Sequence, residues 1–312
     1  MGSYLGNADL KRAKTSIPVP QVHSYSTDPT NEVGAPYILM DYVHGTVARE
    51  LRQAKKCEPG LYGTPDQDRR FRQQMAAIQA ELSSFTFNQI GSLYRDEQTG
   101  DFFIGPEVET GKGPWTSPMD YYADRANHEL QVCARNAAPD VQESWSFAVP
   151  VLFKHLMSLY GDSTARRFRL VNRDFGAHNL LVNNEFEIVS VIDLDGVMAA
   201  PMEVVAQYPA LTGLDREAPG HVETRPAAIE RIKRTAPKLK EYRDMVEIAE
   251  ARVHVNEQNT PIADLMLSDA ASVFQGLLRY GGHQRLVNDK WMEAYLRLLR
   301  GHVMSEEQRE SQ

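Results

Sequence analysis

The segment "LVNRDFGAHNLLVNNEFEIVSVIDLDG", residues 170–196, constrains the fold of this chain more than any other stretch. It places Asp174 in a polar loop, Asn179 five positions later, and Asp193 after a β-branched, apolar run. Asn183 and Asn184 interrupt that run, which predicts two short strands joined by a turn. Because a hairpin carries the chain away and back, we expect Asp193 to return to the neighbourhood of Asp174 and Asn179.

These three side chains suit phosphoryl transfer. That reaction needs a carboxylate to orient the acceptor hydroxyl and hard oxygen ligands to hold Mg²⁺ over the phosphates. Asp174 is the candidate base, and Asn179 and Asp193 are the candidate metal ligands. A structural interpretation uses the same residues differently: Asp174 caps a turn, Asn179 bonds to nearby backbone, and Asp193 ends a strand. The order of the loop, the hairpin and Asp193 favours the catalytic interpretation.

The rest of the chain predicts a short β region followed by a mostly helical body. Residues 15–26 and 35–45 have extended patterns on either side of a turn-forming stretch, and residues 90–105 resemble a second hairpin. Apolar residues at steps of four and three predict a helix at about 66–88, with Phe71, Met75, Ile78, Leu82 and Phe85 on one face. Further helices are expected at about 118–137, 144–160, 226–256, 261–280 and 284–300.

Composition limits the possible partners and location. The formal net charge of −8 over 312 residues argues against nucleic acid or an anionic membrane as the partner. Two cysteines without a C-x-x-C pair argue against a disulfide framework or a cysteine-based zinc site. The first residues contain no apolar signal region, and no apolar run approaches membrane-spanning length. These features predict a cytosolic protein.

The segment "NRDFGAHNLLVNNEFEIVSVIDLDG" resembles the catalytic segment of the aminoglycoside phosphotransferase family, and is most similar to its large filamentous-fungal group. Three further stretches match the family in the same order. They are "TSIPVPQVHSYS", "PYILMDYVHGT", which resembles the hinge strand, and the insert that begins "FNQIGSLYRDEQTG". The resemblance covers roughly residues 9–300.

The resemblance implies an α+β, protein-kinase-like fold with a short β hinge segment, an embedded hairpin in the catalytic loop and a mostly helical C-lobe. The expected domains are 1–45 as a remnant of the N-lobe with the hinge strand, 46–304 as the C-lobe with the catalytic loop at 170–196, and 305–312 as a disordered tail. The implied activity is ATP- and Mg²⁺-dependent phosphorylation of a hydroxyl group on a small metabolite. Asp174 is then the base, Asn179 and Asp193 hold Mg²⁺, and the backbone of Asp41, Tyr42 and Val43 binds adenine.

Two departures from the family pattern leave alternatives open. Asn172 stands where the family usually has His, a residue that ties the catalytic loop to the metal-binding strand; an amide keeps a donor and an acceptor. Only about 35 residues precede the hinge strand, so we expect most of the N-lobe sheet, the Gly-rich loop and the phosphate-binding Lys to be missing; neither Lys11 nor Lys14 has the strand context for that role. The alternative is therefore a catalytically impaired, pseudokinase-like binding or scaffold protein, whose open cleft is covered by self-association or by a partner. A chain that begins within a longer gene product is a further explanation. The acceptor is not specified by these motifs.

Overall fold

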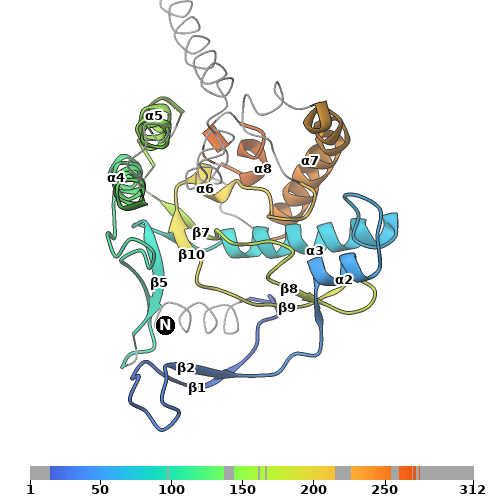
Figure 1. Ribbon diagram of the computed structural model, residues 1–312, viewed down its shortest axis with the longest axis horizontal. Helices are drawn as coiled ribbons and strands as arrows, with labels where there is room; N and C mark the ends of the chain where they lie inside the picture. The colour runs from blue at the N-terminus through green and yellow to red at the C-terminus, as the bar shows by residue number, and fades with distance from the viewer. Residues whose placement is uncertain are drawn as a thin grey trace, which may run out of the picture.

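Helices and antiparallel strands are mixed along the chain (Figure 1). The computed structural model describes residues 15–96, 98–136, 144–160, 162–165, 167–214, 226–253, 260–268, 270–271 and 274. The helices are α2 (Ala48–Ala54), α3 (Pro65–Ser83), α4 (Pro118–Asn136), α5 (Ser144–Tyr160), α6 (Met202–Val205), α7 (Pro226–Arg252) and α8 (Ile262–Leu265). The strands are β1 (Val22–Ser26), β2 (Tyr37–Met40), β3 (Thr46–Val47), β4 (Thr86–Phe87), β5 (Gly91–Arg95), β6 (Phe102–Gly105), β7 (Phe168–Asn172), β8 (Leu180–Val182), β9 (Ile188–Val191) and β10 (Val197–Ala200). The expected α+β class is confirmed.

A five-stranded antiparallel sheet, in the order β4–β7–β10–β5–β6, supports the segment that carries Asp174 and Asp193. Every residue of β7 and β10 is buried. The last residue of β7, Asn172, pairs with Val197, the first residue of β10. Residues 173–196 therefore leave the sheet and return to it at one point.

A second sheet, in the order β3–β8–β9, contains the hairpin expected after Asn179. Asn183 shapes its turn, because its side-chain oxygen accepts hydrogen bonds from the backbone N–H groups of Glu185 and Glu187. The turn predicted at Asn183–Asn184 is thus confirmed. The N–H of Val191 in β9 donates to the carbonyl of Pro18 at 2.8 Å, so the extended segment before β1 lies along this hairpin.

Helix α3 packs one face against β7 and α7. Thr64 caps its N-terminus in a capping box with Gln67, and Pro65 occupies the first turn, where its missing N–H leaves no bond unmade. Phe71 and Met75 are fully buried on the predicted apolar face. The helix ends at Ser83, five residues before the predicted end, because the chain turns there and enters β4. Phe85 still packs against the core, from the connection rather than from the helix.

Helices α4 to α8 lie in the upper half of Figure 1, away from β1 and β2. α4 and α5 pair with each other on the left, α7 lies on the right and contacts α8, and α6 and α8 lie between these two groups. The helices predicted at 118–137 and 144–160 are confirmed, and α7 ends at Arg252, four residues before the predicted end. The helix predicted at 261–280 is wrong in its first part, where α8 ends at Leu265 and a turn follows. The helix predicted at 284–300 lies outside the described residues.

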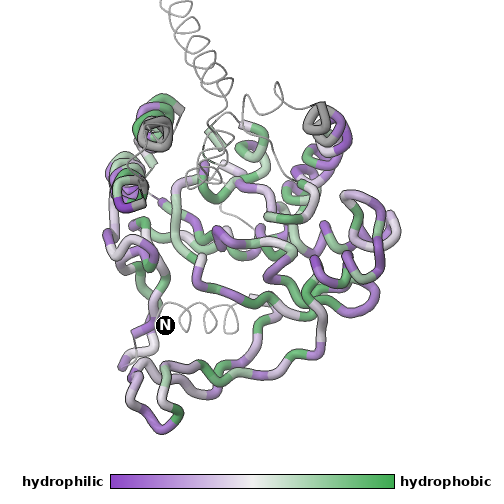
Figure 2. Tube along the Cα trace, viewed as in Figure 1, coloured by the Kyte–Doolittle hydropathy of each residue, from purple (hydrophilic) through white to green (hydrophobic). Residues whose placement is uncertain are grey.

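Strands β1 and β2 form an antiparallel pair, which confirms the first predicted hairpin. β2 ends at Met40, and residues 41–45 lead on to β3 outside any strand, so the strand predicted to reach Gly45 is shorter. Figure 2 shows hydrophobic residues along the β8–β9 hairpin and alternating character along α3. None of the described helices combines the length and apolar character needed to cross a bilayer.

Candidate active site

The loop that follows β7, residues 173–179, brings Asp174 and Asn179 into direct contact. The side-chain nitrogen of Asn179 donates to carboxylate oxygen Oδ2 of Asp174 at 3.0 Å and to its backbone carbonyl at 3.1 Å. Asn179 is buried, whereas more than half of the Asp174 side chain is exposed. Because the amide nitrogen is turned towards Asp174, the carbonyl oxygen of Asn179 is the atom left to serve as a ligand.

Asp193 is held beside this pair through the backbone. The N–H of Ile192 donates to the carbonyl of Asn179 at 2.9 Å. Asp193 itself is exposed and takes a left-handed backbone conformation, with a φ of +57°. This conformation is uncommon for a residue with a side chain. The left-handed residue interrupts the extended backbone two positions after β9 ends at Val191.

Asn172 links the loop to Asp193. Its Oδ1 accepts the backbone N–H of Asp174 at 3.1 Å, and its Nδ2 donates to the carbonyl of Asp193 at 3.4 Å. Gly196 passes so close that an added Cβ would lie 2.7 Å from this Oδ1 and 3.1 Å from the nitrogen of Asp174. Asn172, which stands where the family usually has His, therefore contacts both the catalytic loop and the backbone of Asp193.

A second backbone contact fixes the other side of the loop. The N–H of Ala177 donates to the carbonyl of Ala210, and the N–H of Ala210 donates to the carbonyl of Phe175 at 2.8 Å. A Cβ on Gly176 would lie 2.4 Å from the oxygen of Ala210, so only glycine permits this approach. The loop is thus fixed between the strand ends and the segment that follows α6.

His178 contacts the candidate base. Its Nε2 lies 2.9 Å from Oδ1 of Asp174, and 23% of its side chain is exposed. Its Nδ1 is buried without a hydrogen-bond partner. The sequence predicts a loop-surface residue at this position rather than a catalyst; the side chain is partly exposed and touches the candidate base.

The segment expected to bind adenine, Asp41–Val43, begins where β2 ends. The N–H of Asp41 donates to the carbonyl of Gln21 at 2.8 Å, and its carboxylate lies 2.7 Å from Nε2 of His23. The N–H of Asp41 is therefore already bonded to Gln21, just before β1, and adenine binding would use the groups that follow this N–H. Two residues after this segment, a Cβ on Gly45 would lie 2.9 Å from Val189 in β9, so the chain here lies against the hairpin.

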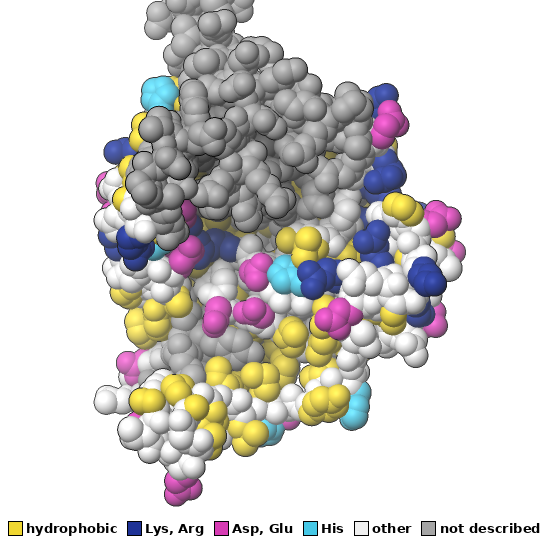
Figure 3. Space-filling model, in the orientation of Figure 1, with side chains coloured by type: hydrophobic (Ala, Val, Ile, Leu, Met, Phe, Trp, Pro, Cys, Tyr) yellow, Lys and Arg dark blue, Asp and Glu magenta, His cyan; other side chains and the backbone are white. Residues whose placement is uncertain are grey.

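Arg173, next to the candidate base, is anchored in a group of charges that sequence analysis missed. Its guanidinium lies 2.8 Å from Glu107, which is fully buried, and 3.3 Å from Glu109. Arg125 of α4 lies 2.7 Å from the same oxygen of Glu109 and 3.4 Å from Glu129. Glu107 and Glu109, the partners of Arg173, come from the connection between β6 and α4, more than 60 residues before Arg173. Figure 3 shows charged side chains in a band across this face, above the hydrophobic residues of the β1–β2 region.

Mutual attraction in this group favours its charged forms. Burial lowers the pKa of Arg125, but the neighbouring Tyr121, Glu107 and Glu109 outweigh that effect, so the pKa is raised overall. Burial raises the pKa of Glu109, yet Arg125 and Arg173 dominate and leave that pKa below its ordinary value. The two arginines and their carboxylates are therefore held as ion pairs.

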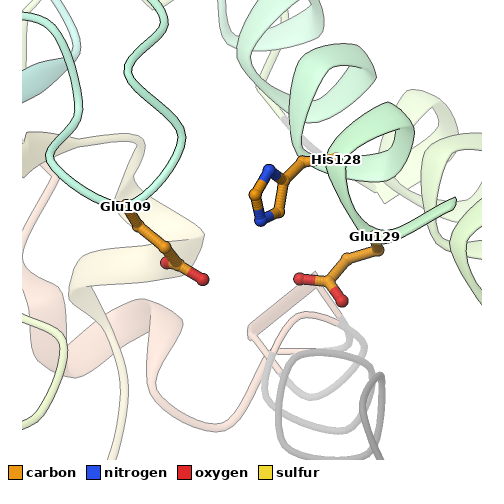
Figure 4. Close-up of side chains that lie close together, drawn as sticks. All are labelled: Glu109, His128 and Glu129. Carbon is orange, nitrogen blue, oxygen red and sulfur yellow. The ribbon is translucent and has the colours of Figure 1, made fainter. Parts of the chain in front are cut away.

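Glu109, His128 and Glu129 form the cluster of possible metal-ligating side chains found among the described residues (Figure 4). Their ligand atoms lie within 4.8 Å of one another. The guanidinium of Arg125, however, already contacts both carboxylates. A cation is thus part of the cluster, and its presence explains why the carboxylates converge.

A cavity of about 260 Å³ borders the loop. Its walls come from α3, β7, the loop itself, α6 and the segment that follows α6. The lining residues are Ile78, Gln79, Leu82, Leu170, Val171, Asn172, Arg173, Asp174, Phe175, Val204, Val205, Gln207, Tyr208, Pro209, Ala210 and Phe274. Asp174 therefore belongs both to the hydrogen-bonded loop and to the rim of a space large enough for a small molecule.

Curated proteins from fungi are similar to this chain. A subtelomeric hrmA-associated cluster protein of Aspergillus fumigatus is 25% identical over 287 residues, which cover 71% of this chain and 54% of the relative. Altered inheritance of mitochondria protein 9, mitochondrial, of Candida tropicalis is 26% identical over 183 residues, which cover 56% of this chain and 29% of the relative. The chain thus spans about half the length of the first relative and less of the second. The cytosolic location expected for this chain stays a prediction.

Solved structures and a family profile complete the comparison. A thermostable mutant of aminoglycoside phosphotransferase APH(4)-Ia in its apo form has a TM-score of 0.46 and 18% identity, covering 98% of this chain and 84% of that chain. A GDP complex of a mutant aminoglycoside 2'-phosphotransferase-IIIa has the same TM-score and 13% identity, covering 97% of this chain and 80% of that chain. The profile of the phosphotransferase enzyme family matches residues 8–204, more than half of the chain. The chain therefore belongs to the phosphotransferase enzyme family and has its kinase-like α+β fold.

Proposed function

We propose that this protein is an ATP- and Mg²⁺-dependent phosphotransferase that phosphorylates a hydroxyl group of a small metabolite. The observation that carries this proposal is the bonded set of Asp174, Asn179 and Asn172, with Asn172 and Ile192 holding Asp193 beside it. Membership of the phosphotransferase family supports the same reaction class. A carboxylate, an amide carbonyl and a second carboxylate form a donor set of hard oxygens, which suits Mg²⁺.

In the proposed reaction, the oxygen of the acceptor hydroxyl attacks the γ-phosphorus of ATP. A new O–P bond forms, the bond from the γ-phosphorus to the β–γ bridging oxygen breaks, and ADP leaves. Asp174 orients the hydroxyl and receives its proton. Asn179 keeps the carboxylate of Asp174 in place through its amide nitrogen. Asn179 and Asp193 would hold Mg²⁺, which when bound neutralises the phosphate charge.

The nucleotide is proposed to lie between the β8–β9 hairpin and residues 41–43. The carbonyl of Asp41 and the backbone of Tyr42 and Val43 would bind adenine, since the N–H of Asp41 is bonded to Gln21. The approach of Gly45 to β9 keeps this segment next to the hairpin that carries the metal ligands. This placement supports binding of adenine and phosphates by adjacent parts of the chain.

Binding of a nonhydrolysable ATP analogue, AMP-PNP, tests this proposal. We expect AMP-PNP to raise the melting temperature when Mg²⁺ is present and to do so much less when EDTA replaces it. Asp193→Asn should remove most of the Mg²⁺-dependent rise in melting temperature, because it deletes a charged ligand. Asp101→Asn, the same change at an exposed position immediately before β6, is the matched control. A folded parent protein that binds no AMP-PNP at millimolar concentration would contradict the proposal. Binding without phosphoryl transfer to any hydroxyl compound would favour the impaired, pseudokinase-like alternative.

A further inference from the structure

The cavity beside Asp174 has mainly apolar walls. Ile78 and Leu82 come from α3, and Val204 and Val205 come from α6; all four line the cavity. Leu170 and Val171 of β7, Pro209, Ala210 and Phe274 continue the same kind of surface. Its volume of about 260 Å³ falls just below the range of roughly 300–1,000 Å³ that is usual for drug-sized ligands. The space therefore suits a compact molecule that buries hydrocarbon.

Most polar side-chain atoms in these walls are already bonded within the protein. The amide of Gln79 donates to the carbonyls of Val205 and Gln207 and accepts from the hydroxyl of Tyr242. Both ends of the Asn172 amide are engaged, as described above. A ligand with many hydroxyl or amino groups would lose hydrogen bonds to water and regain few from these residues.

The remaining polar side chains of the walls are bonded within the protein except at two buried atoms, Oε1 of Gln207 and Nε of Arg173. Gln207 donates to the carbonyls of Glu203 and Ala271, and the hydroxyl of Tyr208 donates to the carbonyl of Leu239. The guanidinium of Arg173 is held by Glu107 and Glu109. Apart from these two atoms and Asp174, the described part of the wall offers a ligand few polar partners, and most of its lining residues are apolar.

Charge in this region also disfavours a cationic ligand. Asp174 is the one carboxylate among the described lining residues, and its two oxygens accept from Asn179 and contact His178. The nearby carboxylates of Glu107, Glu109 and Glu129 are paired with Arg125 and Arg173. An ammonium group entering the cavity would give up its hydration and find these anions already compensated.

We propose that the acceptor is a compact, uncharged and largely apolar alcohol, whose hydrocarbon part fills this cavity while its hydroxyl meets Asp174. This inference rests on the proposed function and specifies its substrate class. The hydroxyl supplies the oxygen of the new O–P bond, and its proton goes to Asp174. The product is a phosphate monoester of the alcohol together with ADP.

Two alcohols of matched shape test the proposal: trans-4-ethylcyclohexylmethanol and trans-4-(aminomethyl)cyclohexylmethanol, in which an ammonium group replaces the terminal methyl group. Binding is measured by calorimetry with and without Mg²⁺ and AMP-PNP, and transfer from ATP is followed by phosphorus NMR. We expect the uncharged alcohol to bind about tenfold more tightly or better, because the ammonium group must be desolvated. Equal or tighter binding of the amine overturns the proposal.

Cavity-filling variants locate the binding site. Val204→Phe should abolish binding of trans-4-ethylcyclohexylmethanol while leaving AMP-PNP binding intact, because Val204 lines the cavity and lies outside the nucleotide region. Val151→Phe, the same change at an exposed position of α5, is the matched control and should bind both AMP-PNP and the uncharged alcohol. If Val204→Phe does not fold, Val204→Leu replaces it with a smaller addition. Unchanged binding of the alcohol in the folded variant overturns the proposal.

The measurements of AMP-PNP binding and of alcohol binding separate this inference from the proposed function. If AMP-PNP binds and neither alcohol does, the apolar-acceptor inference fails and the nucleotide site stands. If AMP-PNP does not bind the parent protein, the proposed function fails and, with it, the assignment of the cavity to an acceptor.

Discussion

Asn172 donates a hydrogen bond from its side-chain nitrogen to the backbone carbonyl of Asp193 at 3.4 Å. Its oxygen at the same time accepts the N–H of Asp174 at 3.1 Å. One short amide thus connects the candidate base to the candidate metal ligand across the base of the hairpin. The family's usual His would need more room, and Gly196 leaves little, since a Cβ there would already lie 2.7 Å from this oxygen. Asn172 and Gly196 therefore fit each other.

Replacing Asn172 with Ala should reduce phosphoryl transfer about 10–100-fold, which is the usual effect of losing a residue that orients metal ligands. The protein should remain folded, because the sheet on either side of Asn172 is unchanged. Steady-state rates of ADP release, with melting temperature measured in parallel, check this. Asn184→Ala, an exposed change in the hairpin turn, is the control and should leave the rate unaltered. A full rate for Asn172→Ala would show that the bridge is dispensable.

Arg173→Met should destabilise the protein by about 3–5 kcal/mol, because it leaves the fully buried carboxylate of Glu107 without its nearest partner. The double variant with Glu107→Gln should recover part of that loss, since the uncompensated charge is then absent. Urea unfolding measures both free energies. Arg69→Met removes an exposed arginine 3.9 Å from Glu241 and should change stability by less than about 1 kcal/mol. Additive effects at positions 107 and 173 would contradict the pairing.

The sequence predicts those parts of the fold that depend on neighbours along the chain. The β8–β9 hairpin follows from its apolar strands and its Asn183 turn, and α3 follows from a periodic apolar face beginning after Thr64. The predicted end of α3, at about residue 88, is too late because Phe85 continues the same periodicity after the backbone has left the helix. Packing of a side chain against the core does not require that its residue be helical.

The sequence pattern does not predict contacts between segments that are far apart in the chain. The insertion of β10 between β7 and β5 joins residues about 100 positions apart, and no local periodicity specifies such a pair. Glu107 and Arg173 illustrate the same limit in the candidate site. A charged residue that appears solvated in a linear pattern becomes buried when two remote segments meet. His178 was missed for a different reason, since its contact depends on the exact course of an irregular loop.

Stability should fall with increasing pH through the ionisation of Glu203. Burial raises the pKa of this carboxyl above its ordinary value of 4.5, although hydrogen bonds from the N–H of Asp162 and the hydroxyl of Tyr122 oppose the shift. The folded state therefore keeps a proton that the unfolded chain releases. This contribution is complete below pH 4.5 and is lost as pH rises through the raised pKa of the folded state.

Glu203→Gln should remove this component and make the free energy of unfolding fall less steeply above pH 4.5. Urea unfolding of the parent and variant at a series of pH values measures the difference. Glu32→Gln, an exposed change in the turn between β1 and β2, should give the parent's pH dependence. Parallel curves for the parent and Glu203→Gln would show that Glu203 makes no such contribution.

His178→Leu should lower the rate of phosphoryl transfer about tenfold, because a hydrogen bond to a charged carboxylate contributes roughly 1.5–3 kcal/mol. His178 lies 2.9 Å from Oδ1 of Asp174 while Asn179 holds Oδ2, so the two residues together fix the orientation of the carboxylate. His178→Gln retains a side-chain N–H donor and should recover much of the rate. The effect should fall on kcat rather than on the KM for ATP, because the contact is made to the base and not to the nucleotide. Equal rates for the Leu and Gln variants would show that the imidazole serves only to fill the loop, and a loss confined to KM would assign His178 to nucleotide binding instead.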